Sequence, residues 1–374
     1  MTSAGFGSAV ITPPLPVVLA GFGARKEPAR EVHDDLEVHA FVVTDGPTTL
    51  CLLVLDLLML GPDVAGPIRA AVGVALGITP AQVLTSCTHT HSGPAATKSV
   101  RRIGWPMPEG YGQTLVDGCV AAATRARASR EPAQLAYARA SLPSDLSLNR
   151  RGLPYDPTYA IMDVQRPDGT RIGTVANVGI HPVALGISCL AVSGDWVTTF
   201  REQARAALGA PVMLLPGALG DVNPTRDPHT EPDPGGNWET ARVLGEEVAD
   251  CVTGLLPHAT AVGGAIEVVA RRLVRVRAGL TIPAVLAGVA GRAVEVELLE
   301  WSLGGIRLVS LPGEAFHALG RAVEQARDDR TLLAGLAPTW HGYLPAPFGK
   351  GYEEKMSYGR GFVRRVGELL TMVP

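Results

Sequence analysis

The sequence carries little charge, and neither sign dominates. Only 18% of its 374 residues are charged, and 33 basic against 36 acidic side chains give a formal net charge of −3. The basic residues are scattered along the chain instead of forming a stripe. A protein without a basic patch has no electrostatic means of holding a polyanion, so we exclude nucleic acid as a partner.

Long apolar runs and a leader-like N-terminus are also missing. The apolar run at residues 50–60 is interrupted by Asp56 and followed by Gly61-Pro62, so it is too short for a membrane-spanning helix. The first ten residues lack a basic segment followed by an apolar core and a small-residue cleavage site. We therefore expect a cytoplasmic protein without stable membrane association.

Cysteine is scarce, whereas glycine and proline are plentiful. Five cysteines, an odd number, lie mostly in apolar segments without CxxC spacing, so we interpret them as reduced core residues. The 43 glycines and 30 prolines are spread through the chain and mark no linker. Because 46% of the residues are hydrophobic, the chain can bury a large core, and we expect one domain over residues 1–374.

Apolar runs rich in leucine and β-branched residues predict strands, and helical periodicity predicts helices between them. Asp45-Gly46 and Pro167-Asp168-Gly169 are turn segments suited to hairpins. The predicted strands are residues 36–43, 48–59, 82–87, 159–164, 171–179, 212–215, 265–276, 293–301 and 306–310. The predicted helices are residues 64–76, 111–129, 195–207, 237–255 and 315–327. Helices mixed with hairpins predict an α/β fold with a mixed β-sheet core and flanking helices.

Polar side chains with catalytic potential follow several predicted strands. His89 and His91 are two residues apart just after a buried strand, so in an extended chain they share one face. Such a pair suits a metal or acid/base site, although surface or hydrogen-bonded histidines explain it equally well. His181 and Glu314 also follow strand ends, and each alone has a structural explanation. Together, two histidines and one carboxylate form a catalytic zinc set that leaves room for water.

Three aspartates occupy turns or an apolar run, where an acidic side chain is expected to have a structural or supporting role. Asp195 follows a glycine before a predicted helix and is interpreted as its cap. Asp221 lies in a similar Gly-Asp turn and either caps the turn or supports a site. Asp56 interrupts an apolar run, so we expect it to be hydrogen-bonded or to orient a ligand histidine.

Collinear motifs over nearly the whole chain resemble a known family. They are ITPP at 11–14, AGFG at 20–23, VHDDL at 32–36, LDLL at 55–58, THTHSGP at 88–94, LNR at 148–150, IHP at 180–182, SGD at 193–195, GDVNP at 220–224, LPGE at 311–314 and GYLP at 342–345. The chain resembles the N-terminal catalytic region of the neutral/alkaline non-lysosomal ceramidases and their shorter bacterial relatives.

The resemblance implies a reaction and a set of site residues. One zinc ion per chain is expected to be bound by His89, His181, Glu314 and Tyr343. His91 and Arg150 are expected to contact the substrate or the developing oxyanion. Zinc polarises a carbonyl and activates water, so the resemblance predicts hydrolysis of a carbon–nitrogen bond in an amide or lactam.

The sequence departs from the family at two points. Asn223 stands where ceramidases have a serine considered for catalysis, and an amide cannot act as a hydroxyl nucleophile. This favours direct attack by water, with Asn223 as a hydrogen-bonding catalytic group. The chain also stops at Pro374, before the family's immunoglobulin-like domain. We therefore expect a small-molecule substrate more soluble than a membrane lipid.

Three other functions stay open at this point, and the oligomeric state is not predicted. An ester or lactone hydrolase would use the same residues. A metallophosphoesterase also uses HxH and Gly-Asp turns, although no asparagine here precedes a histidine. A non-catalytic module would hold zinc in a closed four-ligand site.

Overall fold

The computed structural model describes residues 1–99, 104–226 and 237–373. In it the predicted Asp45-Gly46 hairpin starts the first of three mixed β-sheets, with the order β6-β4-β3-β1-β8. These strands are β1 (Ser3–Val10), β3 (Glu37–Asp45), β4 (Thr48–Leu55), β6 (Val83–Cys87) and β8 (Glu131–Pro132). The pair β3–β4 is antiparallel, whereas β4–β6 is parallel because helix α1 (Pro62–Leu76) connects them.

The second sheet has the order β14-β12-β11-β9-β16, and the third has the order β17-β18-β19-β21. The second contains β9 (Gln134–Ser141), β11 (Thr158–Gln165), β12 (Arg171–Val178), β14 (Val212–Pro216) and β16 (Thr260–Val262). The third contains β17 (Ile266–Arg277), β18 (Ala293–Leu303), β19 (Ile306–Ser310) and β21 (Thr331–Ala334). Each sheet has one parallel pair, so all three are mixed, as the sequence predicts.

Short strand pairs and helices complete the fold. The pairs are β2 (Glu31–Val32) with β13 (Ala191–Val192), β5 (Met59–Leu60) with β7 (Ala95–Ala96), β10 (Ser147–Asn149) with β15 (Val222–Pro224), and β20 (Glu314–Ala315) with β22 (Tyr343–Leu344). The remaining helices are α2 (Tyr111–Ala128), α3 (Trp196–Leu208), α4 (Trp238–Leu255), α5 (Ile282–Leu286), α6 (His317–Gln325), α7 (Tyr352–Lys355), α8 (Arg360–Thr371) and the 3₁₀ turns η1 (Pro80–Gln82) and η3 (Leu256–His258).

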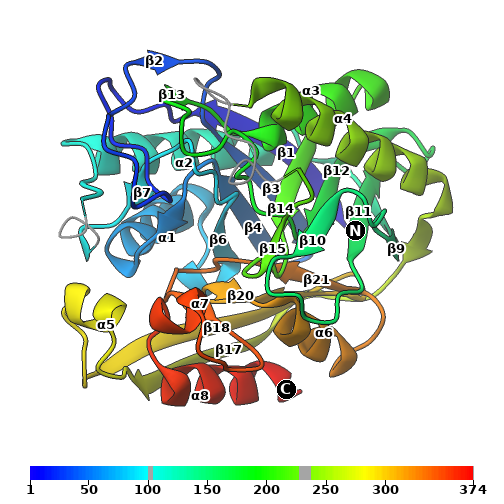
Figure 1. Cartoon of the computed structure of the whole chain (residues 1–374). Helices are drawn as coiled ribbons and strands as arrows, with labels where there is room; N and C mark the ends of the chain where they lie inside the picture. Colours follow the sequence, from blue (N-terminus) through cyan, green and yellow to red (C-terminus); the bar gives the residue numbers. More distant parts are fainter. Residues whose placement is uncertain (100–103, 227–236, 374) are drawn as a thin grey trace.

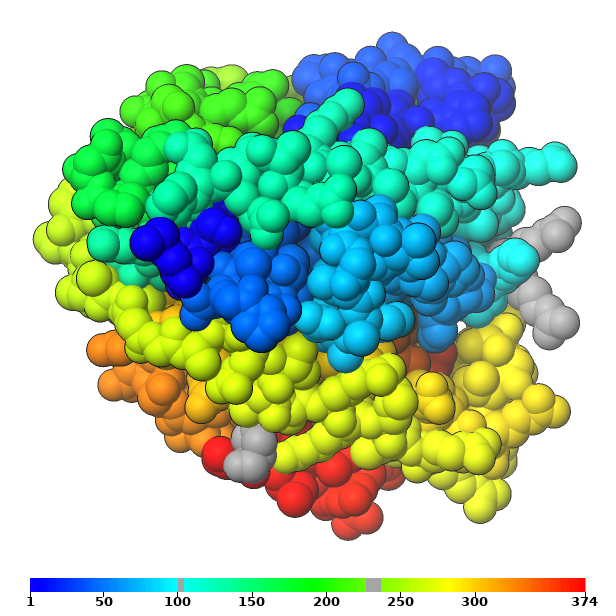
Figure 2. Space-filling model, turned by 180° about the vertical axis from the view of Figure 1, so that it is seen from behind, coloured from blue at the N-terminus to red at the C-terminus, as the bar shows by residue number. Residues whose placement is uncertain are grey.

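The three sheets surround a common apolar core, and helices cover their outer faces (Figure 1). Helices α1 and α2 pack on the first sheet, α3 and α4 on the second, and α6 and α8 on the third. Strand β18 shows this alternation: Leu299 and Trp301 face the common core, while Val296 and Leu298 face the helices. Seen from behind, the yellow-green region that includes β17 lies below the blue N-terminal part (Figure 2).

The predicted α/β class is confirmed. Nearly all predicted strands and helices are present, and their observed ends lie within a few residues of the predicted ones. Residues 56–59, which were predicted to continue β4, lie beyond the end of that strand. Among the described elements of four or more residues, the sequence missed β1, β9, β21, α5, α7 and α8. Asp195 caps α3 as predicted, accepting from the Trp196 N–H at 2.7 Å. All five cysteines are free, as expected. Among the described helices, none combines the length and apolar character that crossing a membrane requires.

The buried Asp56 pairs with an arginine and not with a histidine. Arg201 on α3 donates to both carboxylate oxygens at 2.8 and 2.6 Å, and the Glu37 N–H donates to one of them at 3.0 Å. Asp56 is fully buried and Arg201 is 3% exposed. The pair joins the helix of the second sheet to the first sheet. Of the two roles expected for Asp56, the structure shows the hydrogen-bonded one.

Removing one partner of this pair should destabilise the fold strongly. We expect Arg201→Met to lower the free energy of unfolding by ~3–5 kcal/mol, because the Asp56 carboxylate stays buried without its cation. The matched control is Arg242→Met, which breaks an exposed pair with Glu239 and Glu246 and should leave the free energy of unfolding close to that of the wild type. Urea unfolding of both variants measures the difference, and equal losses would contradict a stabilising role for the buried pair.

Candidate functional site

Three side chains from the ends of three different sheets meet in the interior. His89 follows β6, His181 follows β12, and Glu314 begins β20 shortly after β19. The Glu314 Oε2 atom lies 3.2 Å from His89 Nε2 and 3.5 Å from His181 Nε2. All three residues are 1–3% exposed. The fold therefore brings together three of the four zinc ligands that the family resemblance implies.

Backbone carbonyls fix how the two histidines present their rings. His89 Nδ1 lies 2.6 Å from the Leu58 carbonyl, and His181 Nδ1 lies 3.2 Å from the Val222 carbonyl. A carbonyl only accepts, so each Nδ1 must donate, which leaves the Nε2 lone pair of the neutral ring turned inward. Neither Nε2 nor Glu314 Oε2 has a hydrogen-bond partner. Three inward-facing acceptors in a buried space are the donor set that a cation requires.

His91 lies beside this group. Its ring centroid is 5.1 Å from that of His89 and 5.8 Å from that of His181, and both of its ring nitrogens are buried without a hydrogen-bond partner. Nitrogens of the three histidines lie within 4.8 Å of one another and could hold a metal ion. The donor atoms thus allow two ligand sets, one with three histidines and one with His89, His181 and Glu314.

Burial sets the ionisation of these groups. Burial lowers the pKa of His181 to about 4 and that of His91 well below its usual value, which keeps both rings neutral near pH 7. Burial also opposes ionisation of Glu314, yet His89 and His181 hold its pKa well below the usual range. Burial and the Glu314 carboxylate raise the pKa of Tyr343 well above its usual value. Glu314 is therefore an ionised carboxylate, and the pKa of His181 beside it is lowered.

Arg150 organises the remaining predicted residues. Its guanidinium donates to Glu353 at 2.9 Å, to the Asn223 side-chain oxygen at 2.9 Å, to the Gly220 carbonyl at 2.7 Å and to the Tyr343 hydroxyl at 3.4 Å. Four of its five N–H groups are thereby used. Asn223 is 4% exposed and Tyr343 is 8% exposed. Arg150 thus joins Asn223 and Tyr343 in one network, and at most one N–H remains for another oxygen.

Asp221 holds the backbone segment that carries Arg150. Its carboxylate accepts from the Asn149 side chain and from the His317 N–H, both at 2.7 Å, and its carbonyl accepts from the Arg150 N–H at 2.9 Å. Strands β10 and β15 pair antiparallel here, which places Leu148 opposite Asn223. Asp221 therefore holds the segment that presents Arg150.

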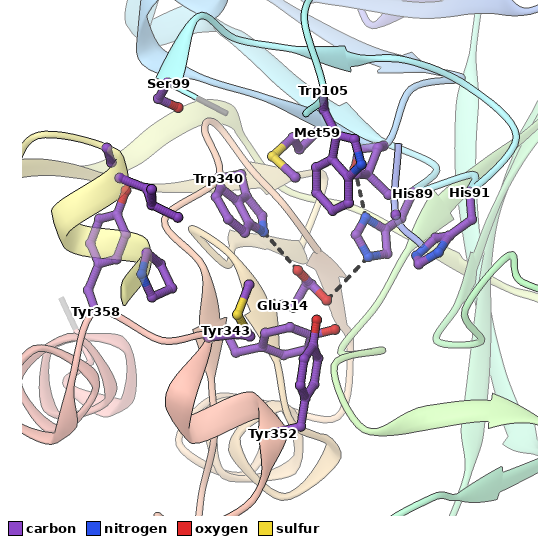
Figure 3. A pocket seen from close by; sticks show the side chains of 16 residues that line it. Met59, His89, His91, Ser99, Trp105, Glu314, Trp340, Tyr343, Tyr352 and Tyr358 are labelled. Atoms are coloured by element: carbon purple, nitrogen blue, oxygen red, sulfur yellow. Dashed lines mark hydrogen bonds and ion pairs between the residues drawn. The ribbon is translucent and has the colours of Figure 1, made fainter. Parts of the chain in front are cut away.

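Two cavities adjoin the histidines and share Gly21, His91, Tyr343 and Tyr352 in their walls. The first is a narrow pocket of about 60 Å³ whose other lining residues are Leu58, Met59, His89, Ser99, Trp105, Pro283, Leu286, Ala287, Glu314, Trp340, Met356 and Tyr358. The second, of about 440 Å³, is lined by Phe22, Gly23, Ala24, Arg150, His181, Val183, Ile187 and Asn223 besides the shared residues. Figure 3 shows Glu314 at the centre of the first pocket, with Trp340 and His89 on either side.

Several residues at the site had weak or no sequence signals. No sequence pattern indicates the hydrogen bond that Trp340 donates to Glu314. Glu353 holds Arg150, and Arg25 donates to the His91 carbonyl at 2.6 Å.

A buried cluster of histidines and a carboxylate at strand ends of an α/β fold is typical of metal-dependent hydrolases. The sequence model described as "Neutral/alkaline non-lysosomal ceramidase, N-terminal" matches residues 3–199, which is more than half of the chain. The protein therefore belongs to this family. No match was found among curated proteins.

Solved structures confirm the fold. The neutral ceramidase of Pseudomonas aeruginosa superimposes with a TM-score of 0.85 at 18% identity, covering 99% of this chain and 73% of that one. A structure described as ceramidase complexed with C2 gives a TM-score of 0.84 at 17% identity, covering 99% and 74%. At these identities the likeness establishes the fold, and the chemistry has to be argued from the residues present.

The loop before β2 should be sensitive to one added methyl group. Gly21 has a φ of +104°, and a Cβ there would lie 2.3 Å from His91 Nδ1. We expect Gly21→Ala to lower the free energy of unfolding by ~1–3 kcal/mol, because the side chain strains the backbone and displaces the His91 ring. In the neighbouring control Gly23→Ala the new Cβ meets no atom within 4 Å. Urea unfolding that finds both variants equally stable would show that the loop does not confine His91.

Proposed function

We propose that this chain is a zinc-dependent amidohydrolase that cleaves an amide or lactam bond of a small molecule with activated water. The observation that carries the proposal is the group of inward-facing acceptors formed by His89 Nε2, His181 Nε2 and Glu314 Oε2. Membership of the ceramidase family supports the class of reaction. We further propose that residues 1–374 act as one catalytic domain.

The donor set fits zinc. Two neutral imidazole nitrogens and one carboxylate oxygen suit this ion, and His89, His181 and Glu314 would hold it with Tyr343 as a fourth, displaceable ligand. When bound, zinc would polarise the scissile carbonyl and lower the pKa of a water molecule. Figure 3 supports a position for Tyr343 next to the site, because its ring lies directly beside the Glu314 carboxylate.

The chain's own residues would orient the substrate and stabilise charge. His91 borders both cavities, and as a neutral ring it can donate one hydrogen bond and accept another. It is therefore suited to hold the carbonyl oxygen or to move a proton to the leaving amine. Arg150 would act mainly by fixing Asn223 and Tyr343, because most of its N–H groups are already used.

The two cavities suggest how an amide would lie. The narrow pocket has aromatic and aliphatic walls, including Trp105, Trp340 and Leu286, and fits a compact apolar group. The larger cavity presents Arg150 and Asn223 and fits a more polar group. Because the histidines lie where the cavities meet, the scissile bond would cross between them. This arrangement supports a small-molecule substrate with one apolar and one polar side.

Of the three alternatives, the metallophosphoesterase and the structural metal site fit less well than the amidohydrolase. An ester or lactone would be attacked at the same site by the same residues. A metallophosphoesterase requires two metal ions about 3.5–4 Å apart, but the part of the chain that the structure describes has a single group of three or more candidate ligands. A purely structural metal would not need two cavities at its side. Turnover of N-acyl amides, lactams, esters and phosphate monoesters, each with and without chelator, tests these readings.

Single alanine variants should separate the two possible ligand sets. We expect His89→Ala and His181→Ala to lose zinc and hydrolysis, because each removes an inward-facing nitrogen. His91→Ala should keep zinc and lose most activity. Elemental analysis of the purified proteins measures this directly. Loss of zinc from His91→Ala with retention in Glu314→Gln would favour the three-histidine set, and full retention in both His89→Ala and His181→Ala would refute the site.

Asn223 should assist the reaction without being essential. We expect Asn223→Ala to lower kcat/KM by about tenfold to a hundredfold, which corresponds to losing one hydrogen bond to the charged Arg150. Arg150 keeps its contacts to Glu353 and the Gly220 carbonyl, so the network should survive. Steady-state kinetics on the substrate found above measures the effect. A complete loss of turnover in a variant that still binds zinc would contradict a merely assisting role for Asn223.

A further inference from the structure

Trp340 contacts the candidate metal ligand Glu314 and also borders the apolar pocket. Its indole Nε1–H donates to Glu314 Oε1 at 2.9 Å. The other oxygen, Oε2, lies between His89 Nε2 and His181 Nε2 and has no hydrogen-bond partner. Figure 3 shows Trp340 and His89 approaching different oxygens of the carboxylate from opposite sides. Oε1 of Glu314 therefore accepts the hydrogen bond from Trp340, while Oε2 faces the two histidines.

We propose that Trp340 is a positioning residue that makes Glu314 a one-oxygen ligand of the metal. The inference rests on the proposed zinc site and adds how that site keeps a position open for the reaction. A carboxylate can bind a metal through one or both oxygens, and the indole N–H occupies the oxygen that two-oxygen binding would need. Because the indole is neutral, it orients the carboxylate without cancelling the negative charge that attracts the cation.

Backbone hydrogen bonds hold Trp340 in place to orient Glu314. The Trp340 N–H donates to the Leu60 carbonyl at 2.9 Å, and the next residue, His341, donates to the Pro312 carbonyl at 3.1 Å. The Glu314 N–H in turn donates to the Gly342 carbonyl at 3.0 Å. The segments that carry Trp340 and Glu314 are thus bonded to each other directly beside the indole contact.

The same short segment also orients a histidine of the site. The Leu58 carbonyl fixes the His89 ring, and the Leu60 carbonyl two residues later fixes the Trp340 backbone. This segment is held in turn by β7, through hydrogen bonds from the Leu58 N–H to the Pro94 carbonyl and from the Gly61 N–H to the Ala96 carbonyl. Residues 58–60 therefore set the directions of both His89 and Glu314.

Two substitutions separate the hydrogen bond from the pocket wall. Trp340→Phe keeps an aromatic wall and removes the N–H, whereas Trp340→Gln keeps an N–H donor and removes the wall. We expect Trp340→Phe to raise the zinc dissociation constant by about 10–100-fold, the usual effect of losing a partner that orients a ligand. Trp340→Gln should bind zinc more tightly than Trp340→Phe. Competition with a chromophoric chelator measures these constants on the full chain.

Trp105 provides the matched control. It lines the same pocket, and in the described part of the chain it has no hydrogen bond to Glu314. Trp105→Phe should leave the zinc dissociation constant within about twofold of the wild type, and thermal unfolding of the metal-free variants checks that each is folded. The inference is overturned if Trp340→Phe binds zinc as the wild type does, or if Trp340→Gln is the weaker binder. Wild-type protein that binds no zinc overturns the proposed function as well, whereas zinc binding without amide turnover overturns only the reaction.

Discussion

The structure depends on one unfavourable arrangement, the meeting of three buried acceptor atoms with no donor among them. His89, His181 and Glu314 each follow a strand of a different sheet, so the atoms that repel one another also mark where the three sheets converge. A buried acceptor without a partner costs roughly 1–3 kcal/mol, and more when it is charged. The fold accepts this cost at one place, and a cation bound there would turn the repulsion into attraction and link the sheets.

Much of the fold could be predicted because the local patterns agree with the final structure. Hairpin turns, apolar strands and the Asp195 cap were readable, since each depends on neighbouring residues. Strand β1 was missed because the side that faces helix α2 is made of the small residues Gly5, Gly7 and Ala9. Helix α2 packs so closely that a Cβ at Gly5 would lie 2.4 Å from the Ala126 carbonyl oxygen. The division into three sheets was not predictable, because strand pairing joins segments far apart in the sequence.

The candidate site was predictable to the extent that its residues follow strands. His89, His181 and Glu314 were found by that rule, and Tyr343, Arg150 and Asn223 came from the resemblance to the family. The residues that orient them left no comparable signal. The contact of Trp340 with Glu314, like that of Glu353 with Arg150, exists only after distant segments have packed. Polar residues that act through another side chain carry no spacing rule, so a sequence alone leaves them as unexplained acids and aromatics.

The narrow pocket has walls of two different origins. Glu314 and the histidines come from the tightly bonded ends of the sheets, whereas Pro283, Leu286 and Ala287 come from the short helix α5, part of the excursion between β17 and β18. Ile282 and Val285 of that helix are 67% and 55% exposed, so α5 is attached to the body on one side only. Because the two walls have different origins, the segment that carries α5 can change while the histidines and Glu314 stay the same. Diversification of substrate choice among relatives would then require rebuilding only a few turns of chain.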